Sequence, residues 1–115
     1  MEKEKSAFEK RAYRRVKREL LCQFKDLDSD NPVSLSETYT TDISEGGLRF
    51  RTPKYIPMNH RLAFTIEIPK HSNIEVTARP AWTNELLSVE QYEVGASFSG
   101  LSSADKAVLR DFINS

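Results

Sequence analysis

The clearest strand pattern in this chain is Leu62-Ala63-Phe64-Thr65-Ile66-Glu67-Ile68. Large apolar side chains occupy every second position, and smaller or polar residues stand between them. A period of two is typical of a β-strand with one face in a core and the other toward solvent. Pro69 follows directly and ends the pattern, because proline cannot donate a hydrogen bond to a neighbouring strand.

Five further stretches show the same period and are separated by turn-forming residues. They cover residues 20–25, 35–43, 48–51, 74–82 and 92–98. In the second of these stretches, Leu35, Tyr39 and Ile43 share one predicted face, and Thr38 and Thr40 share the other. In the third stretch, the pattern predicts that the Leu and Phe side chains point inward.

Two residues within these stretches carry additional information. Cys22 alternates with Leu20 and Phe24, so we expect it to be a buried, small apolar residue. Pro80 interrupts the alternation of Ile74, Val76, Ala78 and Trp82, which predicts a sheet edge or a β-bulge at that point.

The last segment of the chain predicts a helix. Ser102 is a suitable N-cap and Asp105 lies three residues further on. Ala104, Val108 and Phe112, with Leu109 beside them, form an apolar stripe at helical spacing. The whole pattern predicts a mainly β fold, a six-stranded antiparallel barrel with a C-terminal helix over an open end or side. No helix separates the strands, which argues against a parallel α/β fold.

The start of the chain has a different character. Residues 10–18 contain six Lys or Arg, and residues 1–18 carry eight basic and three acidic side chains, whereas the rest has a net charge of −5. We expect residues 2–12 to form a short helix and residues 9–18 to be mobile until a ligand neutralises them. A basic arm on an acidic body suggests an anion held by the arm, although a merely solubilising tail has the same composition.

Length and composition favour one soluble domain. The chain has 115 residues, of which 38% are hydrophobic and 30% charged. We divide it into a basic arm (residues 1–18), a barrel (19–100) and a terminal helix (101–115). No apolar run approaches the roughly 20 residues that cross a bilayer, no signal peptide is visible, and Cys22 stands alone, so we expect a cytoplasmic protein.

The basic arm and one later turn offer complementary chemistry. A guanidinium group matches the O6 and N7 edge of guanine and also binds phosphate, and a carboxylate suits the N1–H and N2–H2 edge. A glycine pair would let the backbone turn sharply or approach a ligand closely. The side chains and glycines that could supply these contacts are Arg11, Arg14, Arg15, Asp42, Ser44, Gly46 and Gly47. They predict a site for an anionic ligand that carries guanine.

These residues also carry a family resemblance. Arg11-xxx-Arg15 followed by Asp42-x-Ser44-x-x-Gly47 resembles the RxxxR and DxSxxG motifs of the PilZ family. Residues 93–98, Glu-Val-Gly-Ala-Ser-Phe, and the Leu-Ser start of the last helix are similar to the final strand and helix of that family. The resemblance implies a PilZ-like barrel and a bacterial receptor for the second messenger cyclic di-GMP.

The resemblance also implies residue roles. Arg11 and Arg15 would bind guanine edges and phosphates, Asp42 and Ser44 would bind the other side of a guanine, and Gly47 would close the turn. Three further candidates for ligand contact are Lys10, Arg14 and Trp82.

Each of these candidates leaves an alternative open. Lys10 precedes RxxxR, a position where the resemblance implies an influence on whether one ligand or an intercalated pair binds. Trp82 is either near the ligand or part of the core. Arg14 and Arg18 also have RxxxR spacing; we prefer Arg11 and Arg15 because Val16 then leads directly into the first strand.

The leading hypothesis is a cyclic di-GMP effector, in which the ligand clamps the arm onto the barrel and alters a surface seen by an unknown partner protein. The alternatives are a nucleic-acid-binding small barrel and a PilZ-like interaction module without ligand. No enzyme is expected, because no Ser-His-Asp grouping or carboxylate pair is visible. His60 and His71 lack ligand-spaced partners, so no metal site and no cofactor are expected.

Overall fold

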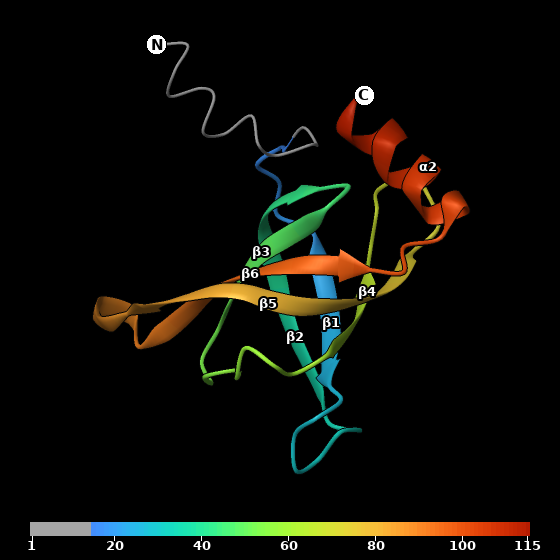
Figure 1. Ribbon diagram of the computed structural model, residues 1–115. Helices are drawn as coiled ribbons and strands as arrows, with labels where there is room; N and C mark the ends of the chain where they lie inside the picture. The colour runs from blue at the N-terminus through green and yellow to red at the C-terminus, as the bar shows by residue number, and fades with distance from the viewer. Residues whose placement is uncertain (1–14) are drawn as a thin grey trace, which may run out of the picture.

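Six antiparallel strands close into a barrel in the computed structural model, which describes residues 15–115 (Figure 1). The strands are β1 (Leu21–Asp26), β2 (Leu35–Ser44), β3 (Gly47–Thr52), β4 (Leu62–Ile66), β5 (Ile74–Leu86) and β6 (Gln91–Ser99). Their order around the barrel is β1-β2-β3-β6-β5-β4, with β1 paired to β4 at the closure. The 3-10 turn η1 (Leu87–Val89) joins β5 to β6, and helix α2 (Ser103–Ile113) follows.

This architecture confirms the predicted mainly β, six-stranded antiparallel barrel with a C-terminal helix. The predicted helix over residues 2–12 lies outside the described residues, and so does the first part of the segment 9–18 that we expect to be mobile. β5 extends four residues beyond the predicted stretch and forms a long ribbon with β6, which leaves the barrel on one side (Figure 1).

The barrel interior is filled by the alternate residues of all six strands. In β4 the predicted face is the buried one, and its Phe64 ring lies 5.2 Å from Phe24 and 5.3 Å from Phe50, centroid to centroid. Cys22 is buried beside them, as predicted. Burial disfavours its thiolate and raises the pKa of Cys22 to about 12, so this thiol stays protonated and unreactive.

A β-bulge in β2 changes which of its residues face the core. The register with β3 shifts between Thr40 and Asp42, so that Thr41 is an extra residue. Before the bulge Thr40 is buried while Leu35 and Tyr39 are exposed, and after it Ile43 is buried. The prediction that one face carries Leu35, Tyr39 and Ile43 together was wrong, because the extra residue reverses the alternation within the strand.

A second bulge lies in β5, where the register with β6 shifts between Pro80 and Trp82. This confirms the predicted irregularity at Pro80. Ala78 and Pro80 are buried, but the extra residue Ala81 turns Trp82 to the outer face, where it is 41% exposed. The interpretation of Trp82 as a core residue was therefore wrong, for the same physical reason as in β2.

Helix α2 begins as predicted, since the Ser102 hydroxyl accepts a hydrogen bond of 3.0 Å from the Asp105 backbone N–H. Its buried side chains are Leu109, Phe112 and Ile113. In the predicted stripe Leu109 and Phe112 are buried and Val108 packs against the core, whereas Ala104 is exposed because only the second half of the helix covers the barrel. In Figure 1, α2 lies beside the end of the barrel where β2 turns into β3.

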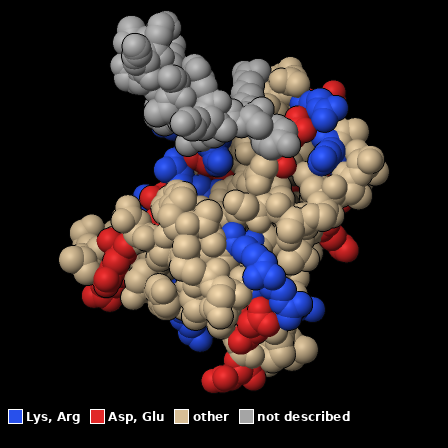
Figure 2. Space-filling model, in the orientation of Figure 1, with Lys and Arg blue, Asp and Glu red and all other residues tan. Residues whose placement is uncertain are grey.

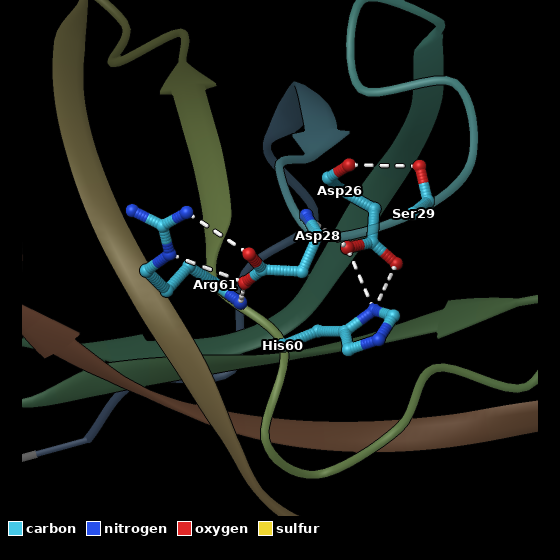
Figure 3. Close-up of polar contacts among 5 residues, drawn as sticks. All are labelled: Asp26, Asp28, Ser29, His60 and Arg61. Carbon is cyan, nitrogen blue, oxygen red and sulfur yellow. Dashed lines mark hydrogen bonds and ion pairs between the residues drawn. The ribbon is translucent and has the colours of Figure 1, made fainter.

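Two side-chain contacts, one of His60 with Asp26 and one of Arg61 with Asp28, fasten the loops at the other end of the barrel (Figure 3). His60 Nδ1 lies 2.8 and 2.9 Å from the two carboxylate oxygens of Asp26. Arg61 binds Asp28 through Nη2 at 2.9 Å and Nε at 3.1 Å, and its backbone N–H adds a third bond of 2.8 Å. The loop after β1 is thereby tied to the residues just before β4.

The Asp28–Arg61 pair leads to a testable pH effect. Hydrogen bonds from Arg61 lower the pKa of Asp28 to about 2, because they favour the charged carboxylate. Since this pKa lies below the ordinary value of about 4, the pair stabilises the fold above pH 4, and the benefit is lost as the pH falls toward 2. Arg61→Gln should return the Asp28 pKa to about 4 in a carboxyl NMR titration. Arg51→Gln should leave it unchanged, and a midpoint near pH 4 in the unmodified protein would refute the assignment.

Candidate ligand-binding site

A two-residue turn, Glu45-Gly46, connects β2 to β3 and fixes which residues face one another across these strands. Ser44 pairs with Gly47, and Asp42 pairs with Arg49. The Ser44 hydroxyl accepts a hydrogen bond from the Gly46 N–H at 3.1 Å and donates to the Gly47 carbonyl at 3.4 Å. Ser44 therefore stabilises the turn in this structure.

The same turn is supported from outside by helix α2. The guanidinium of Arg110 donates two hydrogen bonds of 3.1 Å to the Glu45 carboxylate. These bonds lower the pKa of Glu45, since they favour its charged form. The Gly46 carbonyl also accepts a bond of 2.8 Å from the Phe98 N–H of β6. The turn is thus held between α2 and β6.

Gly47 has a steric role. A Cβ atom on Gly47 would lie 2.1 Å from the carbonyl oxygen of Ala96 in β6, far inside contact distance. Its φ angle is not in the left-handed region, so the requirement for glycine comes from the close approach of β3 to β6. Any side chain here would push the two strands apart.

The segment before β1 places Arg15 beside the turn. Val16 and Ile43 exchange two backbone hydrogen bonds of 3.0 Å, which adds a short antiparallel bridge to the end of β2. Arg15 Nη1 then lies 2.5 Å from Asp42 Oδ1. The guanidinium carbon of Arg18, in contrast, lies 4.9 Å from the centre of the Phe112 ring. Of these two described arginines, Arg15 contacts Asp42 of the second motif, whereas Arg18 lies over a ring of helix α2.

Arg49 is the second partner of Asp42 and was missed by the sequence analysis. Its Nη2 binds Asp42 Oδ2, and its Nε lies 3.8 Å from the Glu93 carboxylate. The Asp42 side chain is only 4% exposed, so its charge is neutralised by two arginines in a largely dry setting. A two-residue Glu45-Gly46 turn would have predicted this pairing, because the turn length fixes the register.

Four residues form a row across neighbouring strands on the outer face of the barrel: Asp42 in β2, Arg49 in β3, Gly95 in β6 and Trp82 in β5. The two bulges put Asp42 and Trp82 on this face. A Cβ on Gly95 would lie 2.2 Å from the Trp82 Nε1, so the indole ring lies directly over the glycine.

The row forms the floor of a hollow of about 340 Å³. The hollow is lined by Arg15, Lys17, Asp42, Gly46, Leu48, Arg49, Ala81, Trp82, Gly95, Ala96 and Ser97. Figure 2 shows a group of Lys and Arg side chains at the upper end of β3, with acidic atoms between them. This arrangement offers several hydrogen-bond donors for an anion, one carboxylate for an N–H edge and one aromatic face for stacking.

The predicted site residues fall into three groups. Arg15, Asp42, Gly46 and Trp82 line the hollow. Ser44 and Gly47 are buried in the adjoining turn. Lys10, Arg11 and Arg14 lie outside the described residues. Over residues 15–115, no three metal-ligating side chains come together and no helix is long and apolar enough to cross a membrane.

The sequence model of the PilZ domain family matches residues 9–115 of this chain. The chain therefore belongs to the PilZ family. No curated protein matches it in sequence.

Solved structures share the fold. Inhibitor of motility MotI/DgrA of Bacillus subtilis is 21% identical with a TM-score of 0.76, over 90% of this chain and 50% of that one. The PilZ domain of Escherichia coli YcgR, solved with c-di-GMP, is 18% identical with a TM-score of 0.69, over 90% of this chain and 88% of that one. MrkH of K. pneumonia, in its complex with c-di-GMP, is 14% identical with a TM-score of 0.70, over 90% of this chain and 50% of that one. The chain thus spans about half the length of MotI and MrkH.

Proposed function

We propose that this protein is a cyclic di-GMP-binding effector module without catalytic activity. The single observation that carries the proposal is the position of Arg15 at 2.5 Å from Asp42. These residues belong to the two motifs that the sequence separates by 26 residues, and they meet at one hollow that also contains an exposed indole ring. The solved c-di-GMP complexes of YcgR and MrkH, which share the fold, support the choice of ligand.

The chemistry of the site suits this ligand. The Asp42 carboxylate accepts hydrogen bonds from the N1–H and N2–H2 edge of one guanine. Ser44, two residues further along β2, adds a hydroxyl group on the same side of the base. Arg11 and Arg15 direct their guanidinium groups at the O6 and N7 edge and at the phosphates, with Arg14 as a further phosphate contact. The Trp82 indole, which lies over Gly95 and is partly exposed, offers a stacking surface for a base.

Binding would join the parts of the chain. In this proposal the basic arm (residues 1–18) closes over the barrel (19–100) when the ligand neutralises its charge, while the terminal helix (101–115) supports the turn through Arg110 and Glu45. Lys10, just before the motif, influences whether one ligand or an intercalated pair is bound. The closed arm then presents a new surface to a partner protein.

Calorimetric titration of cyclic di-GMP into the purified protein tests the proposal. We expect saturable binding with a dissociation constant of about 1 μM or tighter and a stoichiometry of one or two, because several charge-assisted bonds form at once. GTP and a single-stranded oligonucleotide serve as controls and should bind at least tenfold more weakly. Absence of heat and of NMR shift changes at millimolar ligand would contradict the proposal. Preferential oligonucleotide binding that weakens steeply with salt would instead establish the nucleic-acid alternative.

A further inference from the structure

The Asp42 carboxylate has an unusual environment for a residue that is to receive a ligand. It is nearly buried, and each of its oxygens is already bound by a different arginine, Oδ1 by Arg15 and Oδ2 by Arg49. Removing one partner from a buried charge is costly, because the remaining charge loses its compensation in a medium of low dielectric constant. Any ligand that takes Arg15 away from Asp42 must therefore leave another cation in place.

Arg15 and Arg49 are held differently. Arg15 comes from the segment before β1, whose contact with the barrel at this point is the Val16–Ile43 bridge. Arg49 stands in the middle of β3, paired with β2 on one side and β6 on the other. Its Nη2 binds Asp42 of β2, and its Nε lies 3.8 Å from the carboxylate of Glu93 in β6. Because Arg49 stands in a strand that is paired on both sides, Arg15 is the arginine that can exchange partners with a small movement of the chain.

A guanine edge that donates to both carboxylate oxygens must approach Oδ1, where Arg15 is the present partner, and Oδ2, where Arg49 is. Each oxygen has two acceptor positions, so Asp42 can accept from the base and keep Arg49, while Arg15 is the partner that turns to the ligand. The guanidinium group of Arg15 can turn away from Asp42 and toward the ligand. The Nε atoms of both arginines are buried without a hydrogen-bond partner in the described part of the chain, so each guanidinium has one donor that the free protein does not satisfy.

We propose that Arg49 is a positioning residue for ligand binding: it keeps a cation beside Asp42 and keeps the carboxylate correctly oriented when Arg15 exchanges Asp42 for the ligand. The inference rests on the proposed function and adds a residue that neither motif contains. Its place in the row beside Gly95 and Trp82 puts Arg49 at the floor of the hollow, next to Asp42. Among residues 15–115, the other charged groups at this point are Arg15, Lys17, Asp42 and Glu93.

A double-mutant cycle tests whether Arg49 acts through Asp42. Cyclic di-GMP affinity is measured by calorimetry, or by NMR titration where it is weak, for the unmodified protein, Arg49→Gln, Asp42→Asn and the double variant. We expect Arg49→Gln alone to weaken binding about tenfold, and to have less than a twofold effect when Asp42→Asn is already present. Arg49→Lys, which keeps the charge without the planar fork, should recover part of the loss.

Arg51→Gln is the matched control, because Arg51 lies two residues further along β3 on the same outer face but does not line the hollow. It should leave the affinity within twofold. Thermal melting without ligand establishes that each variant is folded. If Arg49→Gln does not fold, the affinity of Arg49→Lys is measured in its place. Additive losses in the cycle, or an unchanged affinity in the folded Arg49 variant, would overturn the inference. Failure of the unmodified protein to bind would instead overturn the proposed function.

Discussion

Gly47→Ala is expected to destabilise the protein strongly, and more than the same substitution at Gly100. The new Cβ would meet the Ala96 carbonyl oxygen at 2.1 Å, and this atom is backbone in a paired strand, so it cannot rotate away. Overpacking against such a neighbour costs about 3 kcal/mol. For a domain of this size, the thermal midpoint should fall by roughly 10 °C or more.

Gly100→Ala provides the matched control. Gly100 has a φ angle of +75°, and nothing lies within 4 Å of the position that its Cβ would take. The substitution therefore costs only backbone strain, about 1 kcal/mol. Calorimetric melting of both variants separates the two causes. If Gly47→Ala melted no lower than Gly100→Ala, the steric account of the glycine in DxSxxG would be wrong.

Arg15→Ala is expected to weaken cyclic di-GMP binding by tenfold to a hundredfold. The substitution removes charge-assisted hydrogen bonds to the ligand, which contribute about 1.5–3 kcal/mol. The free protein should keep its fold, because Asp42 retains its bond to Arg49. The loss should thus appear in the dissociation constant while the thermal midpoint without ligand changes by only a few degrees.

Arg18→Ala distinguishes the two possible motif registers in the same titration. Its guanidinium lies over the Phe112 ring of α2, so its removal should leave the affinity within about twofold. Arg11→Ala, the other half of the preferred pair, should resemble Arg15→Ala. A large loss for Arg18→Ala together with tight binding by Arg15→Ala would mean that the ligand is read by Arg14 and Arg18.

Local pattern was sufficient to predict most of the architecture. The alternation in residues 62–68 predicts β4 because burial of one strand face depends only on the identity of successive side chains. The same holds for Leu48 and Phe50 in β3 and for the Ser102 cap of α2, whose hydrogen bond spans three residues. The two motifs were also visible without a structure, and Asp42 and Arg15 lie where they can act together.

The residues that the pattern placed wrongly follow from the way paired strands match one another. Trp82 faces outward, and Leu35 and Tyr39 lie on the exposed side of β2, because a bulge adds one residue at Ala81 and one at Thr41. A bulge is decided by how two strands match along their length, which the composition of either strand does not reveal.

By itself, the sequence determined the strands, the cap of the last helix and the two motifs, because each depends on neighbours within a few residues. Only the tertiary structure decided that Arg49 shares Asp42 with Arg15, that Trp82 lies over Gly95, and that Gly47 has no room for a side chain. Each of these depends on how one strand or segment lies against another, which the residues of either one do not reveal; for Gly47 the partner strand β6 is distant in the chain, and the strand order of the barrel brings it close.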